Sequence, residues 1–212
     1  LTVEMINYEK YDPNYNGECL LFNGKPNVSK MINKICSYTL RTDMICDKIY
    51  QILKDEPNRN ILILSDRRQH LVDIYTTLFE RNHINKSIMG YYVGGMKNED
   101  LQISESKQIL LGTYNMVSEG FDLPKLDTLV MTSPKSNVEQ SVGRIQRKSM
   151  KDRVYTPLVI DIVDDFSVFG NQAKKRNLFY KKSGFNVIGG EQFENKKDTF
   201  KLNGKSLFML ET

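Results

Sequence analysis

Apolar residues along the chain distinguish a repeating middle section from an irregular beginning and end. Five short apolar runs lie in the middle, at residues 60–65, 87–92, 108–113, 128–133 and 157–164. Runs of this length with few polar interruptions are typical of parallel strands that are covered on both faces. Because polar or amphipathic segments separate them, the pattern predicts an α/β fold with a mostly parallel sheet and helices on both faces.

The segments outside this section follow no clear period. Residues 1–26 are rich in Asn, Gly, Pro and Tyr, so we expect an irregular lead-in or linker that adds a strand near "CLLF". A helical region should follow, with Asn27 and Thr42 as N-caps. The expected parts are therefore the lead-in, an α/β domain at residues 27–185 and an extension of short strands at residues 186–212.

Polar residues follow three of the predicted strands. They are Ser65, Asp66 and Arg67 after the first strand, Thr113 after the third and a Ser-Pro-Lys-Ser segment after the fourth. In an open parallel sheet, ligands bind beyond the carboxyl ends of the strands, so these clusters should share one edge. Asp66, with Gln69 three residues later, also resembles a capping box and predicts the start of a helix.

The segment "VEQSVGRIQR", residues 138–147, would form an amphipathic helix. Its polar stripe consists of Gln140, Arg144 and Arg147, and its apolar stripe of Val138, Val142 and Ile145. The planar fork of arginine suits phosphate oxygens and stays charged at any working pH, so the polar stripe predicts an anion site. Taken alone, such a helix is more often an ordinary surface helix, and that alternative stays open at this point.

The sequence lacks a loop that could hold the phosphates of a nucleotide, here called a phosphate cradle. This sequence contains neither a GxxxxGK[ST] loop nor a DExx-type acidic strand end to hold magnesium. Two arginines without a cradle are expected of half a site that another domain completes, because arginine fingers can act across an interface. The two histidines, His70 and His83, are far from the cysteines in sequence, so we predict no metal site within this chain.

Four consecutive motifs resemble those of the C-terminal RecA-like lobe of superfamily 2 helicases. "ILILSDRRQHL" resembles motif IV, "IMGYYVGGMK" motif IVa, "LLGTYNMVSEGFDLPKLDTLV" motif V and "SPKSNVEQSVGRIQR" motif VI. The continuation "VIDIVDDFSVFGNQAKKRNLFYKKSGFNV" is similar to the end of that lobe in DNA-dependent members. Those members include phage branch-migration helicases, XPB-like repair translocases and transcript-release helicases of poxvirus-type and asfarvirus-type large DNA viruses.

The resemblance implies a role for each matching residue. Arg144 and Arg147 would be catalytic fingers that reach the γ-phosphate, and Gln140 would position that phosphate or the attacking water. Gly120 and Asp122 would approach the nucleotide, with Asp122 near the ribose or linked to motif VI. The implied nucleic-acid contacts are Ser65, Asp66, Arg67, Gly95 and Thr113.

The resemblance also implies cofactors and partners. ATP with Mg²⁺ would be held mostly by an N-terminal lobe that this chain lacks. We therefore expect the full-length protein to be an ATP-dependent helicase and this chain alone to be inactive. DNA is the expected nucleic acid and RNA the alternative. The N-terminal lobe of the same protein is the expected protein partner, and the fragment by itself should be monomeric.

Simpler interpretations remain beside this one. The chain could be a stand-alone nucleic-acid-binding module without motor activity, or a small doubly wound enzyme with its own anion site. "EGFD" could be a helix C-cap and turn, and Ser65 and Asp66 could only cap a helix. The basic segments at residues 147–153 and 174–182 could be solvated surface.

Composition narrows the protein class without deciding the function. With 212 residues, 40% hydrophobic and 26% charged, the chain can bury a core, and its net charge of +4 only mildly favours polyanionic partners. Three cysteines without a CxxC pair favour reduced thiols inside a cell. No run of apolar residues reaches the length of a membrane span. The composition, rich in Asn, Lys and Ile, suits an AT-rich viral genome, and a viral protein would be located in the host cytoplasm or the virion. Because the chain begins at Leu1, we expect it to be part of a longer protein.

Overall fold

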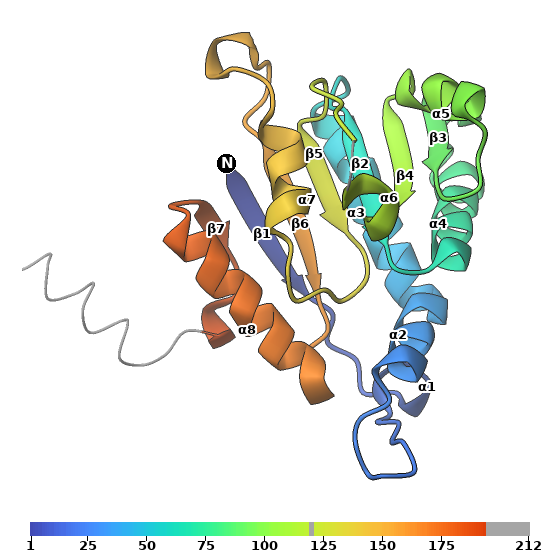
Figure 1. Ribbon diagram of the computed structural model, residues 1–212, viewed down its shortest axis with the longest axis vertical. Coiled ribbons are helices and arrows are strands. Elements are labelled where there is room, and N and C mark those ends of the chain that lie inside the picture. The colour runs from blue at the N-terminus through green and yellow to red at the C-terminus, as the bar shows by residue number, and fades with distance from the viewer. Residues whose placement is uncertain (119–120, 194–212) are drawn as a thin grey trace, which may run out of the picture.

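Seven parallel strands form one sheet in the order β3-β4-β2-β5-β6-β1-β7 in the computed structural model, which describes residues 1–118 and 121–193 (Figure 1). Every strand pairing is parallel. The strands are β1 (Thr2–Asn7), β2 (Ile61–Ser65), β3 (Met89–Tyr92), β4 (Ile109–Thr113), β5 (Thr128–Met131), β6 (Leu158–Val163) and β7 (Asn186–Ile188). This sheet confirms the predicted fold class.

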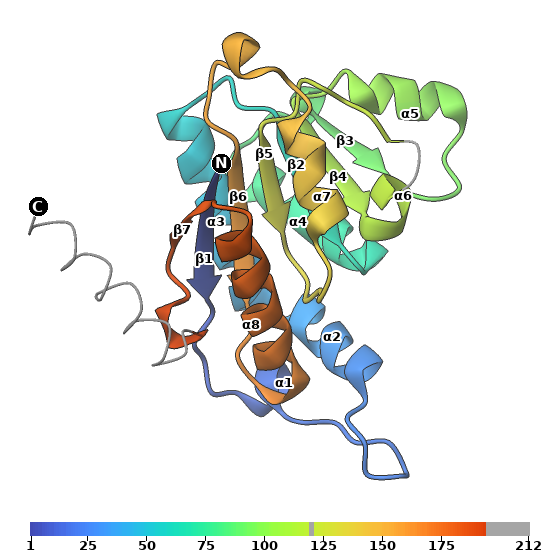
Figure 2. The same cartoon turned by 60° about the vertical axis from the view of Figure 1, so that its left-hand side comes forward.

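Helices cover both faces of the sheet (Figures 1 and 2). The described α-helices are α1 (Pro13–Asn16), α2 (Val28–Ser37), α3 (Thr39–Asp55), α4 (Arg68–Glu80), α5 (Asn98–Glu105), α6 (Tyr114–Ser118), α7 (Glu139–Gly143) and α8 (Ser167–Lys182). Helices α6, α7 and α8 pack with the strands into one apolar cluster, and α3 and α4 into a second cluster on the opposite face. Short 3-10 turns lie at Lys86–Ile88, Arg144–Gln146, Met150–Asp152 and Glu191–Phe193.

The amino-terminal segment differs from the irregular lead-in that the sequence predicts. Strand β1 pairs with β6 along its whole length, from Thr2 opposite Leu158 to Asn7 opposite Val163. Its burial alternates along the strand because only every second side chain faces the core, and this short signal is hidden among polar residues. The expected strand near "CLLF" is reduced to a single bridge between Leu20 and Pro26.

Helix starts agree with the sequence in one case and differ in two. Asn27 caps α2, where its side-chain oxygen accepts a hydrogen bond from the Lys30 amide at 3.1 Å. Thr42 does not cap a helix, because α3 already begins at Thr39. The predicted capping box at Asp66 is also wrong, since Arg67 is the N-cap residue of α4 and makes no side-chain capping bond.

A fully buried ion pair joins α3 to the carboxyl end of β6. Arg41 donates from Nε and Nη2 to the two carboxylate oxygens of Asp164, both at 2.7 Å, and from Nη1 to the carbonyl of Thr132 at 2.8 Å. The hydroxyl of Tyr15 donates to Asp164 at 2.6 Å. Because two charges without water need complete partners, this network fixes the relative position of all four residues.

A second buried pair lies on the other face of the sheet. Arg176 of α8 donates to both carboxylate oxygens of Asp161, at 2.8 and 2.9 Å, and to the carbonyl of Lys135 at 2.6 Å. Tyr180 donates to the same carboxylate at 2.8 Å. The two networks therefore hold the loop between β5 and α7 from opposite sides, through the carbonyls of Thr132 and Lys135.

Removing one partner of the Arg41–Asp164 pair should be costly. We expect Asp164→Ala to lower the free energy of unfolding by about 3–5 kcal/mol, because the Arg41 guanidinium would stay buried without a counter-charge. Lys48→Ala is the matched control, since its pair with Glu4 is about a quarter to a third exposed (26% and 30%) and should contribute less than about 1 kcal/mol. Urea unfolding of the two variants measures both values, and equal losses would contradict the expectation.

Candidate functional site

The polar clusters expected at the strand ends come together in the structure. The amide of Asp66, after β2, donates to the hydroxyl of Ser133, after β5, at 2.8 Å. Lys135 donates to a carboxylate oxygen of Asp66 at 3.2 Å, and its ammonium lies 5.0 Å from the ring centroid of Tyr114, which follows β4. The Tyr114 hydroxyl donates to the carbonyl of Ser133 at 3.2 Å. Loops from three strands thus form one connected edge, which we call the strand-end edge.

Ser65 lies beneath this edge rather than on its surface. Its side chain is fully buried, and its hydroxyl accepts a hydrogen bond from the Arg67 amide at 3.2 Å and lies 3.1 Å from Nδ1 of His70. This arrangement shapes the turn into α4. The predicted contact between Ser65 and a phosphate stays a prediction, and it would require the hydroxyl to leave these partners.

Arg67 is bound to helix α2. Its Nε donates to the side chain of Asn33 at 2.5 Å, and its Nη2 donates to the hydroxyl and the carbonyl of Ser29 at 3.1 and 3.3 Å. The guanidinium therefore fastens α2 to the strand-end edge. Sequence reasoning placed Arg67 at this edge but gave no sign that α2 would be its partner, because the two segments are more than thirty residues apart.

Gly95 and Thr113 lie at the carboxyl ends of the two strands at one side of the sheet, Gly95 three residues after β3 and Thr113 as the last residue of β4. Thr113 is half-buried at the end of β4, where it lies opposite Ser65 of β2. Gly95 follows β3 and has a φ of 83°, a conformation that favours glycine, while a Cβ atom at this position would meet no other atom within 4 Å. The turn geometry therefore explains this glycine, and the open space around it leaves the edge accessible.

Residues 138–147, which we call the arginine segment, are only partly helical. Helix α7 ends at Gly143, and a 3-10 turn spans Arg144–Gln146. The predicted apolar stripe is confirmed, since Val138, Val142 and Ile145 are all buried. Gln140 and Arg147 are exposed and Arg144 is half-buried, so the polar stripe faces outward although the continuous helix predicted for this segment is wrong.

The two arginines differ in their partners. Arg144 donates to the backbone carbonyls of Ser118, at 2.6 Å, and of Phe121, and its Nε is buried with no partner among the described residues. Arg147 is half exposed, and its Nε lies 3.8 Å from a carboxylate oxygen of Asp122. An exposed pair at that distance is weak, so the Arg147 guanidinium can change partners at little cost.

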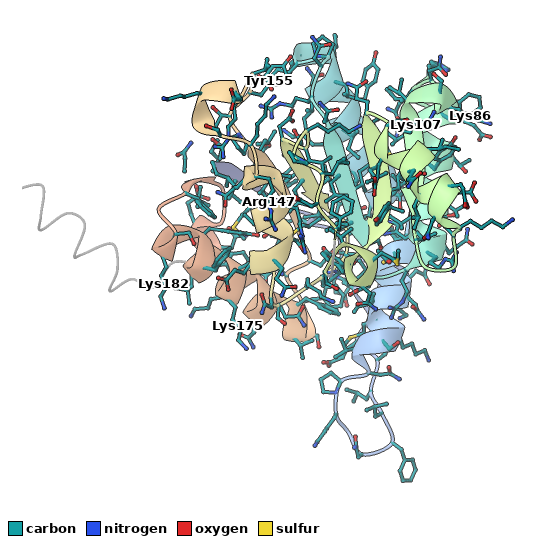
Figure 3. The ribbon with its side chains drawn as sticks, turned by 45° about the horizontal axis from the view of Figure 1, so that its top comes forward. Lys86, Lys107, Arg147, Tyr155, Lys175 and Lys182 are labelled. Atoms are coloured by element: carbon teal, nitrogen blue, oxygen red, sulfur yellow. The ribbon has the colours of Figure 1, made fainter. Side chains whose placement is uncertain are left out.

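The arginine segment lies beside Phe121 and Asp122, the described part of the "EGFD" segment. Arg144 donates to the carbonyl of Phe121, and Arg147 lies near Asp122, so both arginines contact residues after α6. The two alternative roles of Asp122, near the ribose or linked to motif VI, stay predictions. Gly120 lies outside the described residues. Figure 3 shows Arg147 beside α7, on the face that also carries α8, with Lys175 and Lys182 projecting outward from α8.

Residues that the sequence analysis missed hold this site in place. They are Arg41, Asp161, Asp164 and Arg176, which fix the loop between β5 and the arginine segment. A signal was present in "LVIDIVDD", where carboxylates interrupt or end an apolar strand and must find buried cations. The sequence did not indicate which cations those would be.

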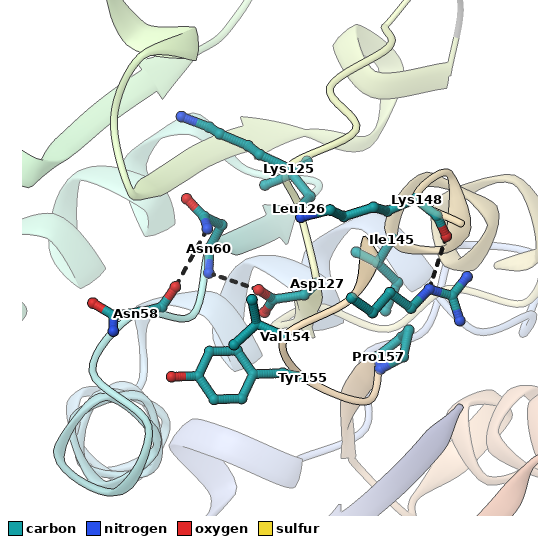
Figure 4. A pocket seen from close by; sticks show the side chains of 11 residues that line it. Asn58, Asn60, Lys125, Leu126, Asp127, Ile145, Lys148, Val154, Tyr155 and Pro157 are labelled. Atoms are coloured by element: carbon teal, nitrogen blue, oxygen red, sulfur yellow. Dashed lines mark hydrogen bonds between the residues drawn. The ribbon is translucent and has the colours of Figure 1, made fainter. Parts of the chain in front are cut away.

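A cavity of about 170 Å³ lies at the opposite end of the sheet, beside the amino ends of β2, β5 and β6 (Figure 4). Ile145 of the arginine segment, Lys148 directly after that segment and Tyr155 line this cavity. Its carboxylate, Asp127, accepts a hydrogen bond from the Asn60 amide at 3.2 Å, and burial raises the pKa of Asp127. The strand-end edge has no part in this cavity. Among the described residues, no three metal-ligating side chains gather into a group that could hold a metal ion.

Comparison with known families identifies the chain. The family model described as the helicase conserved C-terminal domain matches residues 44–149, which is half of the sequence and includes the strand-end edge and the arginine segment. The chain belongs to the helicase C-terminal domain family. Arg144, Arg147 and Asp122 all lie within the matched residues, and their roles at a nucleotide stay predictions.

Relatives of this helicase domain occur in viruses. A protein of Acanthamoeba polyphaga mimivirus that is named as an ATP-dependent RNA helicase is 37% identical over 84% of this chain and 34% of its own length. A protein of Invertebrate iridescent virus 6 that is named as a helicase is 29% identical over 76% of the chain and 38% of its own length. The transcript termination protein of Yaba monkey tumor virus is 33% identical over 52% of the chain and 24% of its own length. The chain thus spans about a third of the first two relatives.

Solved structures support the fold of the helicase domain. The T4 protein UvsW superimposes with a TM-score of 0.64 at 18% identity, over 88% of this chain and 40% of its own. Domain 2 of the DEAD-box helicase Mss116p, solved with an RNA duplex, gives a TM-score of 0.54 at 9% identity over 91% and 66%. At these identities the likeness shows the RecA-like fold alone. No described helix is long and apolar enough to cross a membrane.

The buried His70 should make stability depend on pH. Burial, with a smaller effect of the Arg41 charge, lowers the pKa of His70 from its ordinary 6.5 to about 3, so the unfolded chain binds the proton more readily. The free energy of unfolding should therefore fall as the pH drops from 6.5 towards 3, by up to about 1.4 kcal/mol per pH unit from this group.

Urea unfolding across that pH range measures this slope. We expect His70→Asn to flatten the slope by the contribution of one proton, whatever its effect on stability at neutral pH. His83→Asn is the control, because His83 is exposed and its positive φ of 57° suits asparagine. Equal slopes in both variants and the unsubstituted protein would contradict the assignment.

Proposed function

We propose that this helicase domain is the second lobe of an ATP-dependent superfamily 2 motor that moves along DNA. Its arginine segment would complete an ATP site on a first lobe, and its strand-end edge would grip the nucleic-acid backbone. The observation that carries the proposal is the pairing of Arg144 and Arg147 beside the residues after α6, without a phosphate loop in the sequence. The helicase family to which the chain belongs supports this assignment of the arginines and the nucleic-acid edge to the second lobe.

The two arginines suit different parts of this task. Arg147 is half exposed, and its partner Asp122 is 3.8 Å away, so its guanidinium is available to an incoming phosphate. Arg144 is tied to backbone carbonyls after α6 and would turn toward the nucleotide when a first lobe closes on this surface. The exposed Gln140, one turn earlier, would orient the γ-phosphate or the attacking water. Charge that develops on phosphoryl oxygens is stabilised by such arginines.

ATP and Mg²⁺ would be held mainly by the first lobe. The described residues offer guanidinium groups for the triphosphate but no cluster of carboxylates for the metal ion. Bound ATP supplies the phosphoanhydride whose cleavage drives the cycle. The residues of this chain would orient that group, exclude water when the lobes close, and transmit the closure to the strand-end edge through the loop between β5 and α7.

The strand-end edge would hold the nucleic-acid backbone. Thr113 and Gly95 lie at the ends of neighbouring strands, and Lys135 and Arg67 add positive charge to the edge. Such contacts carry affinity without sequence information, which a motor on any sequence requires. RNA is the second candidate substrate, because the mimivirus relative is named as an RNA helicase and Mss116p domain 2 was solved with an RNA duplex.

The relatives also bear on the biological setting. All three relatives compared above are viral proteins, and one of them is named for transcript termination. We therefore propose a viral helicase that works inside the host cell or the virion, and transcription is the process that its relatives favour.

The finger assignment predicts a separation of binding from turnover. In the protein that joins this domain to its ATP-binding lobe, Arg147→Ala should lower the ATPase rate at least about 10³-fold, because the transition-state charge loses its arginine. The dissociation constant for ATP should change little, since a finger acts mainly in the transition state. Phosphate release and titration with a fluorescent ATP analogue measure the two quantities.

Lys151→Ala serves as the matched control, because this exposed lysine lies four residues further along the same basic segment. Its ATPase rate should stay near that of the unsubstituted protein. If Arg147→Ala retained nearly full turnover, or if both variants lost it equally, the assignment of Arg147 as a finger would be wrong.

A further inference from the structure

A small apolar tip projects from the strand-end side of the molecule. Three consecutive residues at this tip are strongly exposed: Leu20 (57%), Leu21 (46%) and Phe22 (111%). A single exposed apolar residue is ordinary in proteins, whereas three in succession at the end of a protruding loop expose a contiguous apolar patch to water. The mechanism proposed above gives this tip no role.

The tip has a defined conformation. Leu20 and Pro26 form an antiparallel bridge at its base, and the amide of Gly24 donates to the carbonyl of Leu21 at 2.9 Å. This turn places Phe22 at its corner, and Gly24 provides the positive φ of 76° that closes the loop. At this corner the Phe22 side chain is fully exposed to solvent.

The base of the tip is packed into the molecule. Cys19 is buried with Met31 and Ile35 of α2 in a third apolar cluster, which also contains Tyr15 and Phe169. The Asn27 amide donates to the carbonyl of Cys19 at 2.7 Å, which joins the residue before the tip to the N-cap of α2. An exposed apolar surface on a firmly held base loses little conformational entropy when it binds.

Arg67 connects this element to the strand-end edge. Its hydrogen bonds to Ser29 and Asn33 hold the first two turns of α2, which begin directly after the tip. Figures 1 and 2 show from two directions that the loop between α1 and α2 extends beyond the carboxyl ends of the strands. The tip therefore projects from the same side on which we place the nucleic acid.

Charges around the tip favour a polyanion. Lys25 lies within the tip and Lys30 in the first turn of α2, and both are exposed. Residues 19–30 contain these two lysines but no acidic residue, and the acidic residues before them, Glu18 and Asp12, accept hydrogen bonds from the hydroxyls of Ser167 and Tyr38 and keep their charge. An exposed aromatic ring beside lysines is the combination that binds single-stranded nucleic acid, where the ring stacks on a base and the lysines meet phosphates.

We propose that Phe22 stacks on an unpaired nucleobase of the strand bound along the strand-end edge, with Lys25 and Lys30 beside the adjoining phosphates. The inference rests on the proposed nucleic-acid function and adds a base-contacting site to it. A protein partner fits less well, because specific protein interfaces bury about 800 Å² per side and a tip of three side chains offers only a fraction of that area. A single base presents one flat face, which one phenylalanine ring can cover.

The test measures binding of the 212-residue chain to short single-stranded DNA and RNA oligonucleotides that carry 2-aminopurine. Stacking against an aromatic ring changes the fluorescence of this base, so one titration reports both affinity and base contact. Phe22→Ala should weaken binding by about 5-fold to 150-fold and abolish the fluorescence change that stacking produces. Phe22→Trp should restore both.

Two further variants distinguish base stacking from a purely apolar contact and from a general effect of losing a surface ring. Phe22→Leu keeps an apolar side chain without a π-face, so full binding of the oligonucleotide by this variant would overturn the inference and indicate an apolar contact without stacking. Phe79→Ala removes a partly exposed ring (38%) near the far end of α4 and should bind normally. Unchanged binding by Phe22→Ala would also overturn the inference but leave the proposed function intact, whereas no binding by the unsubstituted chain would overturn both.

Discussion

Two buried carboxylates near the end of β6 determine how the rest of the molecule is arranged. Asp164 holds Arg41 from one face of the sheet, and Asp161 holds Arg176 from the other, each with two hydrogen bonds. Because a buried charge without its partner is strongly unfavourable, α3 and α8 have only one acceptable position relative to the sheet. The spare guanidinium nitrogens then bind backbone carbonyls of the loop after β5. The need to pair these buried charges therefore also fixes the loop between β5 and α7.

That loop connects the two surfaces on which the proposed function depends. Ser133 and Lys135 take part in the strand-end edge through Asp66 and Tyr114, and the same loop leads directly into α7 and its arginines. The loop is held at the carbonyls of Thr132 and Lys135, so a displacement of the arginine segment should also move the strand ends. This rigid connection is the kind of physical coupling that a motor needs between its nucleotide and nucleic-acid sites.

The strand-end side also includes an element from the opening of the chain. Helix α2 and the tip before it are far from β2 in sequence, yet Arg67 fastens them beside the edge. Three aromatic rings, Tyr8, Tyr15 and Tyr38, pack together under this element, with the centroids of Tyr8 and Tyr15 5.0 Å apart. The amino-terminal residues therefore extend the domain in two ways, as the strand β1 and as a projecting surface.

The sequence by itself determined the parallel α/β class, the five strands β2 to β6 and the family, because continuous apolar runs and ordered motifs are local signals. It also placed the arginines on one stripe and the polar clusters at the strand ends. Only the tertiary structure decided that β1 pairs with β6, that Arg41 and Arg176 neutralise Asp164 and Asp161, and that Arg67 binds α2. These features depend on contacts between residues that are distant along the chain, and a buried charge gives no sequence signal of which opposite charge will reach it.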